Sequence, residues 1–338
     1  MRQVAIVTGR NMASVELEAG KICQTFRDKG DQAEIFQFDV VGIKRHFDLI
    51  VWWTPLIPHW MVSQQFWLRP SNCSRCISYF VIEGYVMTMS VWKDWIKWQY
   101  IVTPSKFSKS QIEAMGFTVK EVIPHQIPSI MPIDHEYGKT WREKFPTNKK
   151  ILLYNGSQIL RKSLPSLKLA IDMLSKKRDD FIMVYHTDKQ NMPFHTPISE
   201  LQGKNSIIET DFPYLPISKA YAKMSYADII IHPAIVEGFG LPVLEALNLG
   251  KPLVCINAPG VNEIANPKNS FMVQKVMRTT LEWQNYIKFP VVQYKPDDLA
   301  DQIELALDAT STTLDEKKTA GLETAKRYYN TYKRFTEI

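Results

Sequence analysis

The chain has 338 residues, of which 45% are hydrophobic and 22% charged, a composition typical of a globular protein long enough to form two domains. No apolar run approaches the roughly 18 residues that span a bilayer, and the sequence starts with a strand pattern instead of a signal peptide, so we expect a cytoplasmic protein. The net charge of +6 is modest, and no block of Lys and Arg is dense enough to indicate nucleic-acid binding.

Apolar runs of strand length alternate with helical segments along the whole chain, and this pattern occurs twice. It predicts two Rossmann-like α/β domains, each with a doubly wound parallel sheet. In the first half the predicted strands are residues 4–7, 33–38, 49–53, 77–82, 100–103 and 119–123. In the second half they are residues 151–154, 181–185, 206–209, 229–232, 253–256 and 270–273.

A row of aromatic residues follows the fourth predicted strand. Trp92, Trp95 and Trp98 recur at three-residue spacing and are interleaved with Lys93 and Lys97. On a helix these rings would share one face, which either contacts a membrane surface, stacks on sugars or packs into the core. If the rings are exposed, we expect a lipid-linked or membrane-bound acceptor.

The four cysteines give no metal site. Only Cys73 and Cys76 have a suggestive spacing, and a zinc site would need two further ligands, of which the sequence shows no sign. The sequence also lacks an Asp-x-Asp triad that would hold a divalent metal against a diphosphate. We therefore predict neither a metal nor a cofactor.

Prolines and a glycine mark the boundary between the two sets of strands. Pro128, Pro132 and Gly138 interrupt a stretch without sustained periodicity, which we interpret as a linker. The end of the chain has a helical pattern. The predicted division is residues 1–130 for the first domain, 131–149 for the linker, 150–313 for the second domain and 314–338 for a terminal helix.

The strongest functional signal is the stretch Glu237-Gly-Phe-Gly-Leu-Pro-Val-Leu-Glu245, which follows an apolar strand. Gly238 and Gly240 permit a tight turn without a Cβ in the way. Pro242 suits the first position of a helix that ends before Gly250. The turn is therefore predicted to lead into a helix N-terminus.

A helix N-terminus of this kind binds anions. We expect the N–H groups of Gly240, Leu241 and Val243, with the positive end of the helix dipole, to hold a phosphate or a developing oxyanion. Glu237 and Glu245 would repel a phosphate if both faced it, so they are better explained as acceptors of hydroxyl hydrogen bonds. A sugar and a ribose offer such hydroxyls.

These residues resemble the Glu-x7-Glu signature of glycosyltransferase family 4, whose members are retaining enzymes with the GT-B fold, two Rossmann-like domains facing across a cleft. Residues 100–116, 122–128, 221–228 and 259–264 are also similar to family segments. By this resemblance Glu237 contacts hydroxyls of the donor sugar and Glu245 binds the ribose. The loop between them holds the sugar and diphosphate through Gly238, Phe239, Gly240 and Leu241. In such a fold the terminal helix crosses back onto the first domain.

The resemblance also implies cations for the diphosphate, and here the sequence departs from the family pattern. After the first strand of the second domain the family carries Gly-Arg and then Lys-Gly. Gly156 and Lys162 match its glycine and lysine, but Ser157 stands where its arginine belongs. Either Arg161 supplies the missing guanidinium, or the site binds diphosphate with one cation.

The first domain departs further. Family members often place a histidine after one of its strands, near the donor sugar, and the counterpart here is Glu83. Glu83 either accepts a hydrogen bond from the sugar or acceptor, or is a solvated carboxylate at a strand end. His59 is the rival candidate. Gly9 follows the first strand, where it either contacts the acceptor or a phosphate, or forms a simple turn.

Together these features predict a metal-independent retaining hexosyltransferase that uses a UDP- or GDP-sugar and a glycan or lipid-linked acceptor. Base selection is expected at residues 208–214. The alternative is a catalytically inactive GT-B scaffold that binds a nucleotide sugar or glycan, because the family's histidine and arginine are missing. The predicted catalytic residues are Glu237, Lys162, Arg161 and Glu83.

Overall fold

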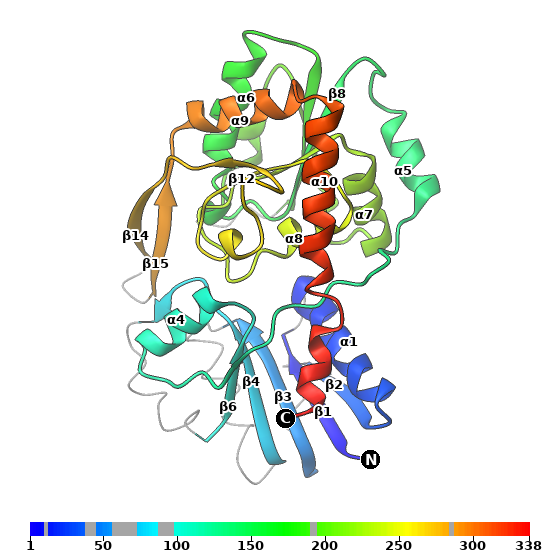
Figure 1. Cartoon of the computed structure of the whole chain (residues 1–338), viewed down its shortest axis with the longest axis vertical. Coiled ribbons are helices and arrows are strands. Elements are labelled where there is room, and N and C mark those ends of the chain that lie inside the picture. Colours follow the sequence, from blue (N-terminus) through cyan, green and yellow to red (C-terminus); the bar gives the residue numbers. More distant parts are fainter. Residues whose placement is uncertain (10–12, 38–44, 56–72, 87–97, 190–194, 284–286) are drawn as a thin grey trace. The chain divides into compact units, whose positions relative to one another are not determined.

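The computed structural model describes residues 1–9, 13–37, 45–55, 73–86, 98–189, 195–283 and 287–338 (Figure 1). These residues form two compact units, each with its own parallel sheet, which confirms the predicted class of two doubly wound α/β domains. The first unit comprises Met1–Gln126, Thr280–Pro290 and Asn330–Ile338. The second unit comprises Ile127–Thr279 and Val291–Tyr329.

The first unit has a parallel sheet in the order β2-β1-β3-β4-β6-β7. The direction of winding reverses at β1, because β2 and β3 pair with its opposite edges. The strands overlap the predicted ones, although the predicted end of the second, Phe38, lies outside the described residues. They are β1 (Gln3–Thr8), β2 (Gln32–Gln37), β3 (Phe47–Pro55), β4 (Cys73–Val81), β6 (Tyr100–Thr103) and β7 (Glu121–Val122).

Both faces of this sheet are covered, which explains why its strands are apolar without alternation. Val4 and Ile6 pack into the core beneath α1 (Ala13–Asp28), whereas Ala5 and Val7 pack into a separate core with α4 (Lys106–Ala114). Successive residues of a strand point to opposite faces, so β1 contributes to both cores.

The last residues of the chain complete the core of the first unit. The helix α10 (Ser311–Lys326) belongs to the second unit, and Asn330 then takes a left-handed conformation with φ of 57°. The following 3-10 segment η6 (Thr331–Thr336) buries Tyr332 and Phe335 against α1. The residues predicted as one terminal helix are thus two segments, one in each unit.

Of the predicted row of tryptophans, the structure describes one. Trp92 and Trp95 lie outside the described residues, and Trp98 is partly buried and packs against a core of the first unit. Two other tryptophans, Trp52 and Trp53 in β3, are buried. The predicted exposed aromatic face therefore stays a prediction.

The second unit has a parallel sheet in the order β10-β9-β8-β11-β12-β13. Its winding reverses at β8, because β9 and β11 pair with opposite edges of that strand. All of these strands overlap predicted ones. They are β8 (Lys150–Asn155), β9 (Phe181–His186), β10 (Ser206–Glu209), β11 (Ile229–His232), β12 (Leu253–Ile256) and β13 (Phe271–Val273).

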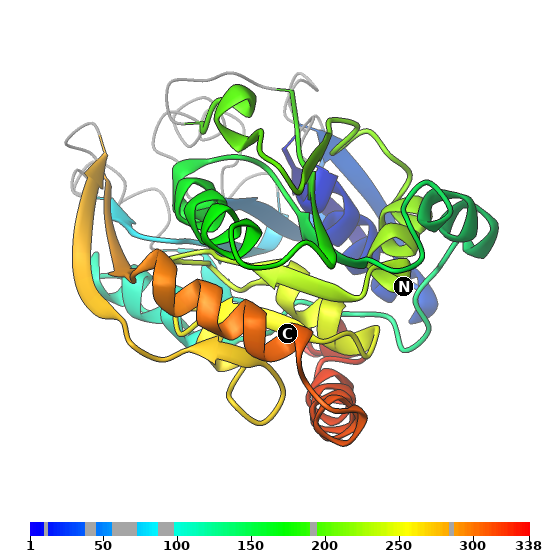
Figure 2. The same cartoon turned by 90° about the horizontal axis from the view of Figure 1, so that it is seen from above.

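Helices cover both faces of the second sheet (Figure 2). They are α5 (His135–Arg142), α6 (Leu164–Ser175), α7 (Ile217–Tyr226), α8 (Leu241–Asn248), α9 (Pro296–Leu307) and α10. Within this layer arrangement α6 packs against α9, α5 against α7, and α8 against α10. The residues predicted as a linker contain α5, whose first turn is capped by Asp134 accepting from the N–H of Tyr137 at 3.0 Å.

A small separate sheet was not predicted. It consists of β14 (Met277–Trp283), β15 (Ile287–Gln293) and β5 (Tyr85–Val86), in the order β14-β15-β5. β15 pairs antiparallel with β5. Gly84 permits this approach, because a Cβ at that position would lie 2.4 Å from the carbonyl oxygen of Lys288.

Candidate functional site

The loop between β11 and α8 has the predicted form. Gly240 takes a left-handed conformation with φ of 102° and precedes α8, in whose first turn Pro242 lies. The helix ends at Asn248, and Gly250 follows with φ of 64°. The N-terminus of α8 therefore stands next to the glutamate loop, as the sequence predicted.

One of the three amides predicted to hold an anion is not available. The N–H of Val243 donates to the carbonyl oxygen of Gly240 at 3.0 Å, and the N–H of Leu244 donates to the same oxygen at 3.2 Å. The first turn of α8 is tight, so it closes on Gly240 one residue earlier than an ideal α-helix would. The expectation for Val243 was wrong, and the amides of Gly240 and Leu241 stay predicted.

Glu237 is the centre of a buried charged group, which we call the Glu237 group: Glu237, Arg161, Lys162 and His232. The Glu237 side chain is 7% exposed, and its Oε1 atom forms an ion pair with Lys162, whose side chain is 8% exposed. Its Oε2 atom accepts a hydrogen bond from Nη1 of Arg161 at 2.9 Å. Nε2 of His232 lies 3.1 Å from Oε1, without hydrogen-bond geometry.

These charges determine the ionisation of the group. Burial alone would raise the pKa of the Glu237 carboxyl, but the cations of Arg161 and Lys162 outweigh it and hold this pKa well below its usual value. Burial lowers the pKa of His232, and the neighbouring cations add to this effect although Glu237 opposes it. At neutral pH Glu237 is an anion and therefore only accepts hydrogen bonds.

The Glu237 group lies where the winding of the second sheet reverses. Arg161 and Lys162 belong to the 3-10 turn η3 (Leu160–Lys162) that follows β8, and Glu237 follows β11, the neighbouring strand. The N–H of Ile235 donates to the carbonyl oxygen of Arg161 at 2.9 Å, which joins the two segments. Doubly wound sheets bind ligands at this point, beyond the carboxyl ends of their strands.

Glu245 lies on α8 and is also buried, with 8% of its surface exposed. The hydroxyl of Tyr221, on α7, donates to Oε1 of Glu245 at 3.0 Å. Tyr221 is itself 2% exposed, so its ring holds the hydroxyl in place. This contact orients the acid that the family resemblance assigns to ribose.

Replacing Tyr221 with phenylalanine is expected to weaken donor binding by about ten- to a hundredfold with little change in turnover. The substitution removes a hydrogen bond to a carboxylate, worth about 1.5–3 kcal/mol, and keeps the ring. Calorimetric titration with nucleoside diphosphates measures the change. Tyr226→Phe on the same helix is the control, and equal affinities for the two variants would show that Tyr221 does not orient Glu245.

The remaining predicted donor residues lie around the same strand ends. The N–H of Gly156 donates to the carbonyl oxygen of His186 at 3.1 Å, and the hydroxyl of Tyr154 donates to the carbonyl oxygen of Ser157. The ring of Phe239 is 4% exposed and packs into the core of the second unit. Gly156 and Ser157 thus belong to the turn that leads from β8 towards the two cations.

A second charged group lies beyond β9 and β10, in the segment predicted to select the base. Nζ of Lys223, which is 1% exposed, lies 2.8 Å from Oε2 of Glu209 and 2.9 Å from Oδ1 of Asp211. Nε2 of His186 lies 2.9 Å from the same Asp211 oxygen. His186 at this short distance, followed by the ammonium of Lys223, lowers the pKa of Asp211, although burial opposes this effect. These ion pairs fix the loop after β10.

Of the predicted residues in the first half, the structure describes Gly9 and Glu83, which belong to the first unit. Gly9 directly follows β1 and is buried. Glu83 is partly buried and lies between β4 and β5. His59 lies outside the described residues.

Sequence reasoning missed His232, Tyr221 and Gly260. His232 ends β11, five residues before Glu237, and its position at the end of an apolar strand was the available signal. Gly260 has φ of 78°, and a Cβ there would lie 1.9 Å from the carbonyl oxygen of Glu237. The N–H of Glu237 donates to the carbonyl oxygen of Pro259 at 3.0 Å, so Gly260 packs directly on the glutamate loop.

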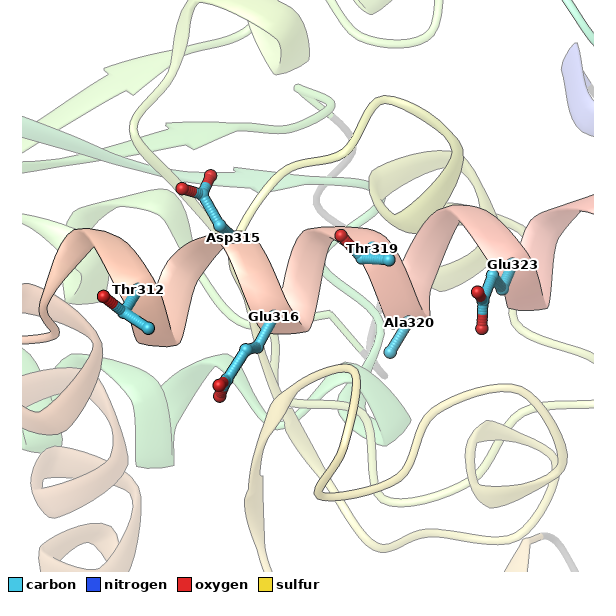
Figure 3. A pocket seen from close by; sticks show the side chains of 6 residues that line it. All are labelled: Thr312, Asp315, Glu316, Thr319, Ala320 and Glu323. Carbon is cyan, nitrogen blue, oxygen red and sulfur yellow. The ribbon is translucent and has the colours of Figure 1, made fainter.

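The surface of α10 carries a shallow hollow that contributes nothing to this site. It measures about 510 Å³, and Figure 3 shows that its side chains all come from one helix and do not converge. The lining residues are Thr312, Asp315, Glu316, Thr319, Ala320 and Glu323. In the described residues no cluster of His, Cys, Asp and Glu has the composition of a metal site, and no helix is long and apolar enough to cross a membrane.

Solved structures share the fold of the whole chain. HepE from Anabaena, solved with UDP and glucose, has a TM-score of 0.75 and 13% identity over 100% of this chain and 98% of that one. A glycosyltransferase from Rickettsia africae ESF-5 has a TM-score of 0.72 and 17% identity over 99% of this chain and 96% of that one. At these identities the likeness shows the fold alone, and it confirms the GT-B class.

Curated relatives match shorter stretches. O-antigen chain mannosyltransferase B of Escherichia coli is 25% identical over 185 residues, which cover 48% of this chain and 45% of that protein. An uncharacterized glycosyltransferase of Sulfolobus islandicus rod-shaped virus 1 is 29% identical over 113 residues, which cover 32% of this chain and 33% of that protein. The chain thus spans less than half the length of these relatives.

A family model covers more of the chain. The model described as glycosyl transferases group 1 matches residues 139–320, which is more than half of the sequence. The chain therefore belongs to the glycosyl transferases group 1 family. The matched residues include the Glu237 group and Glu245.

Proposed function

We propose that this protein is a retaining glycosyltransferase of family 4 that transfers a hexose from a UDP- or GDP-sugar to an acceptor hydroxyl. The Glu237 group carries the proposal, because it places one carboxylate and two cations at the point where a doubly wound sheet binds ligands. The family match supports a sugar-transferring activity. HepE, which shares the fold, binds UDP-glucose, and this supports a nucleotide-sugar donor.

The two cations suit the departing diphosphate. When the bond between the anomeric carbon and the diphosphate breaks, negative charge develops on the phosphate oxygens, and fixed positive charges in a buried site stabilise it strongly. Lys162 and Arg161 supply these charges, and the N-terminus of α8 at Gly240 and Leu241 adds its dipole. We propose that these groups act without a divalent metal.

Glu237 has a second role in this proposal. Its carboxylate forms ion pairs with both Arg161 and Lys162, and the diphosphate of the donor competes for the same cations. When Arg161 and Lys162 bind the diphosphate, the carboxylate of Glu237 loses their hydrogen bonds. Hydroxyl groups of the donor sugar then donate hydrogen bonds to the Glu237 oxygens in their place. Glu245, oriented by Tyr221, then holds the ribose.

Arg161 takes the place of the family's missing arginine in this mechanism. Its guanidinium donates to Glu237 next to the Lys162 ammonium, so both cations reach one carboxylate. Ser157 lies only four residues earlier in the same turn region after β8. The guanidinium of Arg161, four residues after the position of the family's arginine, supplies the second positive charge that Ser157 cannot supply.

The acceptor is proposed to be a glycan or a lipid-linked glycan bound by the first unit. Glu83 is the proposed partner of the acceptor hydroxyl, and Gly9 and His59 are further candidates. A cytoplasmic location with peripheral membrane contact through Trp92, Trp95 and Trp98 completes this proposal.

The test is an assay of nucleotide release. The protein is incubated with a panel of UDP- and GDP-sugars, with and without a chelator, and free UDP or GDP is measured. Release that the chelator leaves unchanged and Glu237→Ala abolishes supports the enzyme. Glu136→Ala, at an exposed glutamate of α5, is the matched control, and NMR of the product anomer tests retention.

Two outcomes count against the proposal. Tight binding of a nucleotide sugar without turnover, under every acceptor tried, would favour the alternative of an inactive scaffold, which the missing arginine and histidine motivate. Binding of none of the sugar nucleotides would remove the Glu237 group as a donor site.

A further inference from the structure

Among the residues that the structure describes, the outer strand of the β14–β15 hairpin forms the edge of its sheet. In the described part of the chain β14 pairs only with β15, since it stands at the end of the order β14-β15-β5 (Figure 1). The strand is seven residues long and contains no proline. Met277 is 62% exposed and Leu281 43% exposed. Proteins normally shorten, interrupt or cover such edges, because the unpaired N–H and C=O groups bind further strands.

We propose that β14 pairs antiparallel with β14 of a second copy of this chain, around a two-fold axis at Thr280. The partner's strand then satisfies the open edge and covers the exposed apolar side chains. A two-fold axis closes the assembly at a dimer, because the same edge serves both copies. This interface is independent of the proposed sugar transfer.

The sequence of β14 is self-complementary in this register. Arg278 lies opposite Glu282 of the partner subunit, and the axis repeats this pair on the other side. Thr279 lies opposite Leu281 of the partner subunit, and Thr280 faces its own copy. Opposite charges at directly facing positions stabilise an antiparallel pair, whereas like charges destabilise it.

The two charged side chains are available for this pairing. Arg278 is exposed. Glu282 is held from one side by Lys288 of β15, whose Nζ lies 2.8 Å from Oε1, and 49% of the Glu282 side chain is exposed. A carboxylate accepts several hydrogen bonds, so the pair with Lys288 orients Glu282 and leaves capacity for an arginine.

The charge pattern favours a second copy over a membrane as the occupant. An anionic lipid surface attracts clusters of Lys and Arg, with about 1 kcal/mol for each. On β14 itself the two charged residues, Arg278 and Glu282, carry opposite signs. In an antiparallel pair of two β14 strands, the positive Arg278 of each copy therefore lies opposite a negative Glu282, so the charges of the two copies are complementary.

Sedimentation over a wide range of protein concentration measures the dimer. Arg278→Glu alone and Glu282→Arg alone should each weaken dimerisation by about tenfold or more, since each places like charges opposite one another twice. The double variant Arg278→Glu with Glu282→Arg should restore it. An equimolar mixture of the two single variants should also dimerise, because each copy then faces an opposite charge. Lys204→Glu, at an exposed lysine of the second unit, is the matched control.

Three results would overturn the proposal. A wild-type monomer at every concentration excludes the interface. A dimer that the single charge reversals leave unchanged lies on another surface. Flotation with anionic vesicles that requires Arg278, without any dimer in solution, assigns the edge to a membrane instead.

Discussion

Replacing Lys162 with methionine is expected to lower the turnover number by about 10²–10³-fold, the loss typical of removing one preorganised charge or donor from a buried catalytic site. The Lys162 side chain is 8% exposed, so water screens its charge only weakly and does not replace it after substitution. Methionine has a similar length and flexibility and fills the same space. Steady-state kinetics of nucleotide release measure the effect.

Arg161→Met should have a smaller effect than Lys162→Met. The Arg161 side chain is 21% exposed, and water partly screens its charge. Lys177→Met, at an exposed lysine of the same unit, is the control for a change in net charge. If Lys162→Met kept normal turnover with an unchanged melting temperature, the cation would have no part in the chemistry, and the proposed stabilisation of the leaving group would be wrong.

The sequence predicted those features that depend on neighbouring residues. The strands of both parallel sheets are continuous apolar runs because both faces of each sheet are covered, and such runs are visible without any knowledge of the partners. The turn at Gly240 and the helix after it follow from local backbone preferences of glycine and proline. The ion pair of Glu237 with Lys162 was not deduced, but both residues were named.

The contacts that could not be predicted from the sequence join segments that meet only in the folded chain. Tyr221 reaches Glu245 from another helix, and the clash that makes Gly260 necessary involves a carbonyl oxygen on a different loop. Neither contact leaves a periodic signal. The hairpin β14–β15 was also missed, although Met277, Leu281 and Trp283 of β14 alternate with Arg278, Thr280 and Glu282, which is the period-2 pattern typical of a strand.

Gly260→Ala is expected to lower both stability and turnover, the latter by about 10²-fold. The new Cβ would stand 1.9 Å from the carbonyl oxygen of Glu237 and 2.8 Å from its carbonyl carbon, and backbone atoms cannot rotate away as a side chain does. The glutamate loop must therefore move, although the hydrogen bond from the N–H of Glu237 to Pro259 holds it in place. A displacement of about 1 Å at a catalytic group costs roughly 10²-fold in rate.

Gly30→Ala separates this clash from the strain of a left-handed backbone. Gly30 has φ of 92°, and a Cβ there would meet nothing within 4 Å, so its substitution carries only the conformational cost of about 1–2 kcal/mol. Both variants should melt at lower temperature than the wild type, but Gly260→Ala alone should lose turnover. Equal turnover in the two variants would show that the glutamate loop tolerates displacement. The exact position of Glu237 would then not be required for catalysis, against the proposal.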